Sequence, residues 1–363
     1  MRRAFVAALM VAAVGACGDG TQVAIAISAP PELVSTFDEF VEFIPGPRLA
    51  VVGADDAMPA AGYRIEVATD LGGCTECYRI EPMATDARGW VVHASDRLGA
   101  QYGVAEVFEL LGYRFRHPFD TYVPARPTPD AAGLARLRTV RAPAMRVRGL
   151  HLHTLHPIEA EYALWETSSD DRRARQIFDW TVKNRGNFVQ WVAMDDILEP
   201  TRGDAWTAAA SGQIEAAHRR GLEVGLAFQI FGQSSLQHGY DLIDDLDRPF
   251  AEQIAERLPR ITDGVPFDTY EMSFGEFFGA DPATFIATVD ETYRQLTARS
   301  PQAEVTAVIH VGDSPEQHVT YMGEDLIYYF LVKFADPRIV PQVHTTMYYD
   351  LFEDAGGAYH HEE

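Results

Sequence analysis

The sequence AAASGQIEAAHRRGLEVGLAFQI, residues 208–230, contains the structural unit that recurs through most of the chain. We expect Ala208 to Arg220 to form a helix that ends at Gly221, because glycine readily adopts the left-handed conformation that terminates helices. The apolar stretch from Leu222 to Ile230 then predicts a buried strand. Helices alternating with buried strands are typical of a parallel sheet covered by helices.

The same alternation extends over residues 145–363. Polar residues follow several of the expected strands, and no glycine-rich loop follows the first one. Both features favour a TIM-type (β/α) barrel over an open doubly wound sheet. A closed barrel has eight strands, and about six are expected here, so we interpret this α/β region as an incomplete, C-terminally truncated barrel domain. The other five strands are expected at residues 147–153, 188–194, 269–274, 304–311 and 343–348, and further helices at 170–183 and 282–298.

A smaller α/β pattern occupies residues 22–136. Residues 63–67 and 77–80 are interpreted as a β-hairpin, because two short apolar segments are separated by a glycine-containing turn. Apolar residues between Val104 and Leu111 recur at helical spacing, which predicts an amphipathic helix. A proline-spaced segment, residues 124–129, then predicts a linker to the barrel domain.

The first seventeen residues form a targeting signal and no part of the fold. Arg2 and Arg3 precede an apolar run, and small residues stand directly before Cys17. This pattern is typical of a bacterial lipoprotein signal peptide, in which Cys17 becomes the lipidated N-terminus, and an ordinary secretory signal is the alternative. The apolar run is too short for a permanent membrane-spanning helix. We therefore expect an exported lipoprotein whose membrane contact is its N-terminal lipid.

Charge and cysteine content narrow the possible partners. The 53 acidic residues outnumber the 30 basic ones, which gives a net charge of -23. A chain with this much negative charge repels the phosphate backbones of nucleic acids. We therefore expect no nucleic-acid partner. Cys74 and Cys77 predict a local disulfide in an oxidising compartment, with two free thiols as the alternative, and two cysteines alone make a poor zinc site. The sequence indicates no cofactor and no particular oligomeric state.

Several short motifs lie in a fixed order before the barrel. They are Tyr63-Arg-Ile65, Gly99-Ala-Gln-Tyr-Gly103 and Leu111-Gly-Tyr-Arg114. Over residues 60–125 this series resembles the accessory domain that precedes the barrel in family-20 hexosaminidases and α-glucuronidases. The resemblance implies a glycoside hydrolase that acts on oligo- or polysaccharides. The segment Glu271–Glu276 is similar to the end of the fourth strand in those hexosaminidases, but Gly275 replaces the aspartate that orients the acetamido group, so the sugar stays open.

Glycoside cleavage needs a proton donor and a second carboxylate. Glu276 is the expected acid, because its phenylalanine neighbours favour a raised pKa. Asp313, which follows the fifth strand, is the expected base. Asp196, which follows the second strand, is an expected substrate-binding residue. These loops should converge, since the strand ends of a barrel lie on one face.

Five further residues are expected to bind the sugar. The resemblance implies that Arg148, at the start of the first strand, binds sugar hydroxyls. His151 and His153 point to one side of that strand, and Trp191 and Tyr348 offer rings for stacking.

Two other functions stay open. The histidines of the first strand, together with His310 and His344, could bind a metal as in amidohydrolase-type barrels. The chain could also be a carbohydrate-binding lipoprotein without catalytic activity.

Overall fold

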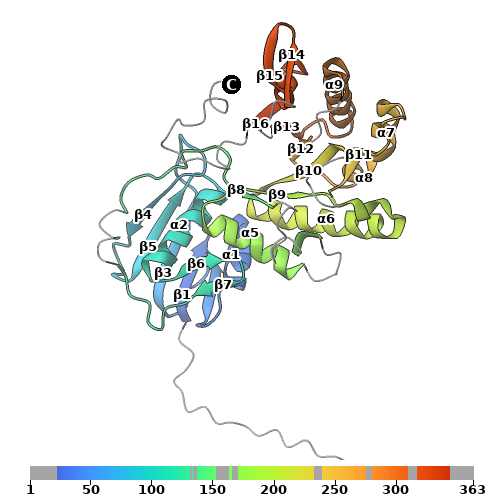
Figure 1. The fold of residues 1–363 in the computed structure, drawn as a ribbon. Coiled ribbons are helices and arrows are strands. Elements are labelled where there is room, and N and C mark those ends of the chain that lie inside the picture. The colour runs from blue at the N-terminus through green and yellow to red at the C-terminus, as the bar shows by residue number, and fades with distance from the viewer. Residues whose placement is uncertain are drawn as a thin grey trace, which may run out of the picture.

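The computed structural model describes residues 23–130, 133, 137–152, 163–165, 171–232, 239–274, 280–309 and 317–343 (Figure 1). These residues form two main sheets with helices packed against them. One sheet lies within residues 23–94 and the other within residues 149–343. None of the described helices combines the length and apolar character that a membrane crossing requires. The predicted domain boundaries, 22–136 and 145–363, stay predictions.

The first sheet has the strand order β2-β1-β3-β5-β4. All neighbours in it are parallel except β4, which runs antiparallel to β5. An antiparallel hairpin of β6 and β7 follows. The elements are β1 (Val23–Ala29), α1 (Pro31–Glu42), β2 (Leu49–Gly53), β3 (Ala61–Ala68), β4 (Tyr78–Pro82), β5 (Gly89–Ala94), α2 (Arg97–Leu110), β6 (Arg114–His117) and β7 (Asp120–Tyr122).

The hairpin predicted for residues 63–67 and 77–80 is wrong. Strand β5 lies between β3 and β4, with Ile65 opposite Trp90 and Ile80 opposite Val92. The side chains of Trp90 and Val92 on β5 are buried. Closeness in sequence therefore does not predict which strands pair here.

The second sheet is a curled, all-parallel half-barrel with the order β16-β13-β12-β10-β9-β8, and β11 also pairs with β10 (Figure 1). The predicted α/β class and barrel-type sheet are therefore confirmed. The strands are β8 (Gly149–His151), β9 (Phe188–Val192), β10 (Glu223–Phe231), β11 (Asp241–Ile243), β12 (Thr269–Ser273), β13 (Glu304–Ile309) and β16 (Val340–Val343).

Helices cover one side of this sheet. A small antiparallel hairpin, β14 (His318–Tyr321) and β15 (Glu324–Ile327), precedes the 3-10 helix η3 (Tyr328–Phe334). The other helical elements are α5 (Arg172–Lys183), η1 (Asp195–Leu198), α6 (Pro200–Arg220), α7 (Phe250–Arg257), α8 (Pro259–Thr262) and α9 (Pro282–Arg299).

Several element boundaries differ from the predicted ones, most clearly at α6 and at the last described strand. Helix α6 starts at Pro200, earlier than expected, because proline is well suited to the first helical position. The last described strand covers 340–343, where we expected 343–348, and residues 344–348 lie outside the described residues.

Side chains of the half-barrel alternate between its two faces, as the two-residue period of strands requires. Trp191, Leu226 and Tyr270 are neighbours on adjacent strands and point to the helices. One residue along, Glu271 and Thr306 pair across β12 and β13 and point to the opposite face, which we call the inner face. Positions on the inner face are therefore free of the helix layer.

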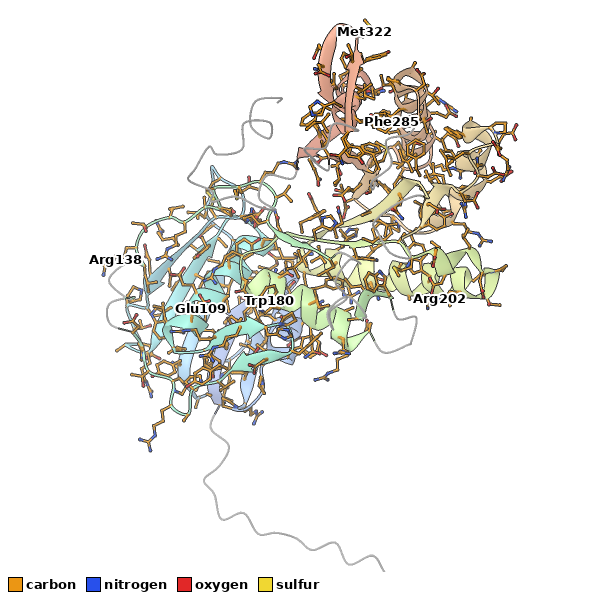
Figure 2. The ribbon with its side chains drawn as sticks, in the orientation of Figure 1. Glu109, Arg138, Trp180, Arg202, Phe285 and Met322 are labelled. Atoms are coloured by element: carbon orange, nitrogen blue, oxygen red, sulfur yellow. A yellow bond between two sulfur atoms is a disulfide. The ribbon has the colours of Figure 1, made fainter. Side chains whose placement is uncertain are left out.

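The two sheets are held against each other by contacts among α1, α2, β6, α5 and α6. Trp180 on α5 donates from its indole nitrogen to the carbonyl oxygen of Phe115 on β6 at 3.0 Å (Figure 2). The Lys183 ammonium, 1% exposed, reaches the carbonyl oxygen of Phe40 on α1 at 2.6 Å. These buried contacts fix where the barrel strands begin.

Candidate functional site

Three strands bring a histidine, a glutamine and a glutamate together on the inner face. His151 on β8 is paired in register with Gln190 on β9, and their side-chain nitrogens Nε2 lie 3.4 Å apart. Glu271 on β12 places its Oε1 3.5 Å from the same His151 nitrogen. Burial differs within the group, because 37% of the His151 side chain is exposed while Glu271 is almost fully covered. The ring of His151 therefore connects a buried carboxyl group to the surface.

Burial sets the protonation of this cluster. Loss of hydration raises the pKa of Glu271 to about 7. Hydrogen bonding to Gln190 lowers this pKa by a smaller amount. Burial lowers the pKa of His151, so the imidazole is neutral at pH 7. No cation is therefore held against the carboxyl group by the described residues. A carboxyl group in this state can donate or accept a proton near neutral pH, as an acid catalyst must.

Three buried polar atoms on the inner face have no hydrogen-bond partner among the described residues. They are Oε1 of Gln190, Oε2 of Glu271 and Oγ1 of Thr306. A buried polar atom without a partner costs about 1–3 kcal/mol, so such atoms are uncommon and point to a missing partner. We therefore take Gln190, Glu271 and Thr306, with His151 beside them, as the candidate site.

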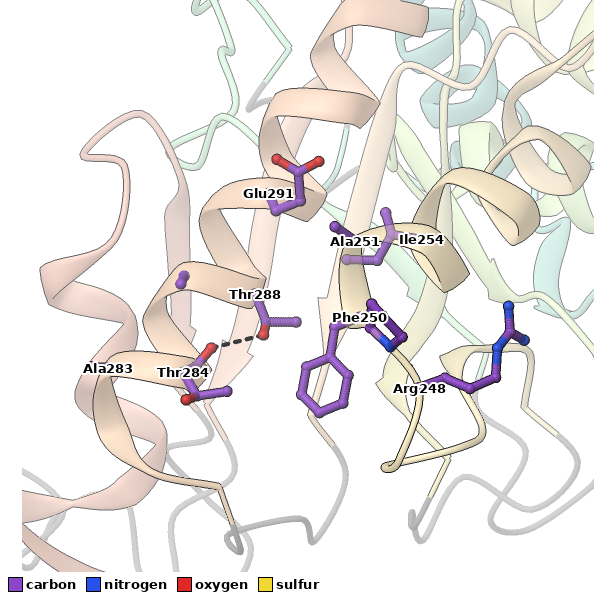
Figure 3. A pocket seen from close by; sticks show the side chains of 10 residues that line it. Arg248, Phe250, Ala251, Ile254, Ala283, Thr284, Thr288 and Glu291 are labelled. Carbon is purple, nitrogen blue, oxygen red and sulfur yellow. Dashed lines mark hydrogen bonds between the residues drawn. The ribbon is translucent and has the colours of Figure 1, made fainter.

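Two surface hollows lie away from the candidate site. One groove, with a volume of about 560 Å³, runs between α7 and α9 and is lined by Phe250, Ile254 and Thr288 (Figure 3). A second, of about 620 Å³, lies around His218 and Asp268. Neither groove is lined by a residue of the candidate site, so hollow size does not identify the site here.

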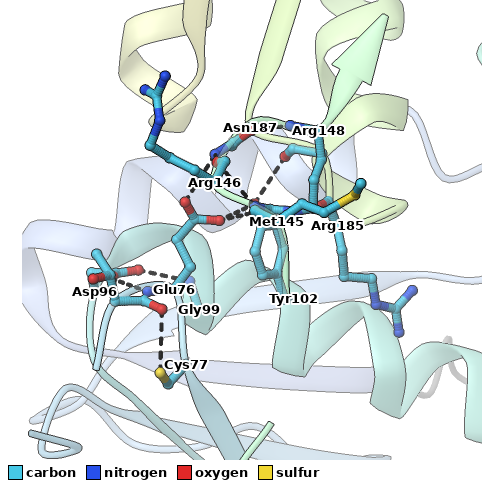
Figure 4. A network of polar contacts seen from close by, with 12 residues as sticks. Glu76, Cys77, Asp96, Gly99, Tyr102, Met145, Arg146, Arg148, Arg185 and Asn187 are labelled. Carbon is cyan, nitrogen blue, oxygen red and sulfur yellow. Dashed lines mark hydrogen bonds and ion pairs between the residues drawn. The ribbon is translucent and has the colours of Figure 1, made fainter. Parts of the chain in front are cut away.

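Arg148 is engaged in contacts with other protein groups, and its predicted sugar-binding role stays a prediction. Its guanidinium group is engaged by the contact between the two sheets (Figure 4). It forms an ion pair with Glu76, donates to the Tyr102 hydroxyl at 3.1 Å, and donates to the Arg185 carbonyl oxygen at 2.9 Å. Arg148 also directly precedes β8, so it lies at the opposite end of the strand from the expected active face.

Trp191 is buried in this structure, and its predicted stacking role stays a prediction. Its indole is 0% exposed and packs edge-on against Phe267, with ring centroids 5.2 Å apart. The helix layer covers that face of β9. A sugar cannot reach the ring without removal of a helix.

Asp196 lies where its predicted role requires. It belongs to η1, directly after β9, at the carboxyl end of the sheet. Its Oδ2 accepts from Nε of Arg202 at 2.6 Å, and 46% of the side chain is exposed. Its substrate contact stays a prediction.

The remaining predicted residues, Cys17, His153, Glu276, Asp313 and Tyr348, lie outside the described residues. Their roles stay predictions. Strand β12 ends at Ser273, shortly before Glu276, and β13 ends at Ile309, shortly before Asp313. Because β12 and β13 are paired neighbours, both chain segments leave the sheet at the same edge.

Sequence reasoning missed Gln190, Glu271 and Thr306 as site residues. Each is a polar residue inside a short strand that is otherwise largely apolar, namely FVQWV, TYEMS and EVTAVI. That interruption is the signal that could have found them, since buried strands of parallel sheets are normally apolar throughout.

The described residues contain no group of three or more histidine, cysteine, aspartate or glutamate side chains placed to hold a metal ion. Of the four histidines of the metal hypothesis, His151 is described, and His153, His310 and His344 are not. The metal hypothesis therefore stays open.

Comparisons with known proteins place the fold. No family model and no curated protein matches the sequence. Among solved structures, a family-20 β-N-acetylhexosaminidase from Streptomyces coelicolor gives a TM-score of 0.54 at 13% identity over 78% of this chain and 61% of that chain. A β-hexosaminidase from Streptomyces plicatus, in complex with GlcNAc, gives 0.51 at 15% identity over 78% and 60%. The likeness shows that the matched part of this chain has the fold of these proteins.

A second glycosidase family shares this fold. An enzyme of family 138 that targets pectin rhamnogalacturonan II gives a TM-score of 0.50 at 13% identity and covers 78% of this chain. The chain spans between 44% and 61% of the length of these three proteins. Enzymes with different substrates therefore match equally well, and the likeness does not name the sugar.

Proposed function

We propose that this chain binds a carbohydrate on the inner face and hydrolyses a glycosidic bond by carboxylate catalysis. The observation that carries the proposal is the likeness of the half-barrel to the folds of known glycosidases. Glu271 adds a buried carboxyl group with a pKa raised to about 7 on strand β12, the strand that precedes Glu276 in the chain.

The chemistry is assigned to the residues that follow β12 and β13. Glu276 donates its proton to the glycosidic oxygen as the bond between that oxygen and the anomeric carbon breaks. Water adds to the anomeric carbon, and Asp313 takes the proton that this water loses. The pairing of Ser273 with Val308 at the ends of the two strands supports this assignment, because it starts both segments side by side.

Turnover by the purified chain tests the proposal. We expect hydrolysis of at least one member of a panel of 4-nitrophenyl glycosides. The Glu276→Gln variant should lose about 100-fold or more in kcat, since positioned acid catalysis contributes roughly that factor. Glu223→Gln serves as the matched control, because Glu223 starts β10 at the opposite edge of the sheet.

Three results would redirect the proposal. Unchanged kcat in Glu276→Gln removes this residue from the mechanism. Stoichiometric zinc, with activity lost on chelation, favours the metal-dependent hydrolase. Sugar binding without turnover by the wild-type chain favours a non-catalytic carbohydrate-binding protein.

We also propose that the protein is exported and anchored by lipid on Cys17. The disulfide between Cys74 and Cys77 supports an oxidising compartment. A Cys17→Ser variant should move from the membrane fraction to the soluble fraction after cell lysis. Retention of this variant in the membrane fraction would remove the lipid anchor from the account.

A further inference from the structure

The polar groups of the inner face are buried deeply and come from separate strands. Gln190 and Thr306 are each 1% exposed and Glu271 is 2% exposed. Each retains one oxygen without a hydrogen-bond partner among the described residues. These three oxygens lie on β9, β12 and β13, so the feature does not arise from one distorted loop.

Small residues on β10 let the Gln190 side chain pack directly over that strand. A Cβ atom at Gly225 would lie 2.5 Å from Oε1 of Gln190, closer than any real contact. Glycine therefore allows the Gln190 side chain to lie across β10 toward Glu271, with which it shares a hydrogen bond. The next inner-face residue on β10 is Ala227, which pairs with Glu271. A side chain at Gly225 would collide with Gln190 in this position.

We propose that Gln190, Glu271 and Thr306 form a subsite that binds the hydroxyl groups of an uncharged sugar ring. The proposal rests on the carbohydrate substrate proposed above and goes further, because it excludes acidic sugars from this subsite. An amide, a hydroxyl and a protonated carboxyl group can each donate and accept a hydrogen bond. Sugar hydroxyls have the same double capacity.

The charges around Glu271 support an uncharged ligand. The titratable group facing it among the described residues is His151 on β8. The facing residues from β9, β10 and β13 are Gln190, Ala227 and Thr306, which do not titrate. The described strands β8, β9, β10, β12, β13 and β16 contain no lysine or arginine. The carboxylate of a uronate would therefore face the carboxyl group of Glu271. Proteins usually bind carboxylates with a cationic side chain, which these strands lack.

Calorimetric titration of the full chain with methyl glycosides tests the subsite. The probes are the methyl glycosides of glucose, galactose and N-acetylglucosamine, with methyl glucuronide and methyl galacturonide as acidic counterparts. We expect at least one neutral probe to bind about tenfold or more tightly than its acidic counterpart at pH 6. Thr306→Val should weaken that binding by about fivefold or more, because one hydrogen bond is lost at constant volume.

The pH profile separates a ligand contact from a structural role. Affinity of the wild-type chain should fall as pH rises above about 7, because Glu271 then loses the proton that it donates to the sugar. In Glu271→Gln the amide donates at every pH, so this fall should disappear. The matched control is Thr292→Val, since Thr292 is fully buried on α9 and its hydroxyl already donates to the Thr288 carbonyl oxygen at 2.9 Å.

Each of the following results decides whether the subsite exists or whether the chain hydrolyses sugars. Equal or tighter binding of the uronide, unchanged affinity in Thr306→Val, or a wild-type pH profile in Glu271→Gln overturns the subsite. Because Thr306→Val conserves volume, its result stands even where a Glu271 variant does not fold. A wild-type chain that binds neutral sugar but does not hydrolyse it removes the proposed hydrolysis and keeps the subsite. Hydrolysis with an unchanged KM in Thr306→Val removes the subsite and keeps the hydrolysis.

Discussion

The contact between the two sheets and the inner face of the half-barrel both bury ionisable side chains, and they compensate them differently. At the contact, Lys183 pairs with Asp179 at 2.5 Å and Arg220 pairs with Glu39 at 2.5 Å. On the inner face, the described neighbours of Glu271 are neutral, so no ion pair offsets its burial.

The difference separates a structural region from a binding region. Opposite charges at the contact offset part of the cost of burial, although burial still raises the pKa of Asp179 and lowers the pKa of Lys183. Loss of hydration at Glu271 is not offset in this way, which destabilises the fold at neutral pH. A group that destabilises the free protein is typical of a site that awaits a ligand.

The largest effect should follow from breaking the contact. Lys183→Met leaves the buried Asp179 carboxyl group without its cation, which should lower the free energy of unfolding by about 3–5 kcal/mol. The double variant Lys183→Met, Asp179→Leu should recover most of that loss, because both charges are then removed. Urea unfolding of the three proteins measures this. A loss below about 1 kcal/mol in the single variant would contradict the assigned role of the pair.

Removing the buried carboxyl group of the inner face should raise the free energy of unfolding, and the size of this effect should depend on pH. Folding raises the pKa of Glu271 from 4.5 to about 7, so the folded state holds this proton more tightly than the unfolded state. The wild-type protein therefore loses stability as pH rises from about 4.5 to about 7, by up to roughly 3 kcal/mol. Glu271→Gln lacks this loss, so its free energy of unfolding should exceed that of the wild type at pH 8.

Urea unfolding at pH 5 and pH 8 measures this second prediction. The difference between Glu271→Gln and wild type should be small at pH 5 and grow by up to about 3 kcal/mol at pH 8. A difference that is equal at both pH values would show that Glu271 titrates normally in the folded protein.

A smaller effect is expected at Arg148. Arg148→Lys removes the planar donor geometry that contacts Glu76 and Tyr102, so it should cost about 1–2 kcal/mol of stability. Sugar affinity should stay within about twofold, since Arg148 lies at the structural contact. Thermal unfolding and calorimetric titration measure the two quantities. Lost affinity with unchanged stability would support the sugar-binding role that the sequence resemblance implied.

The smallest stability effect is expected at Asp196. Its ion pair with Arg202 is partly exposed, so Asp196→Asn should change the free energy of unfolding by less than about 1 kcal/mol. Sugar affinity should still fall by several-fold if Asp196 contacts the substrate as proposed. An unchanged affinity would leave Asp196 as a surface residue of η1.

The sequence was sufficient to predict the parallel half-barrel, because its apolar strands and amphipathic helices are local patterns. It was not sufficient for the order of strands in the first sheet, since β5, with Trp90 and Val92 buried, lies between β3 and β4. The surroundings of Arg148 and Trp191 could not be predicted for a similar reason. A motif shows which residue type stands at a position. Whether that residue lies at the amino or the carboxyl end of a strand, and whether helices cover its face of the sheet, depends on elements far away in the sequence.

The site shows the same limit. Glu271 was visible in the sequence as part of a motif, but its raised pKa comes from burial within the sheet. Its neighbours Gln190 and Thr306 belong to strands that are far away in the sequence. Only the three-dimensional register brings these polar residues onto one face.

The measurement that tests the central claim most directly is an NMR titration of the Glu271 side-chain carboxyl carbon in the full chain. The signal is assigned by its absence in Glu271→Gln. We predict a midpoint near pH 7 and a shift of that midpoint to higher pH when a neutral methyl glycoside binds, because the ligand prefers the protonated carboxyl group. A midpoint near the ordinary glutamate value, or one that no sugar moves, would contradict the account.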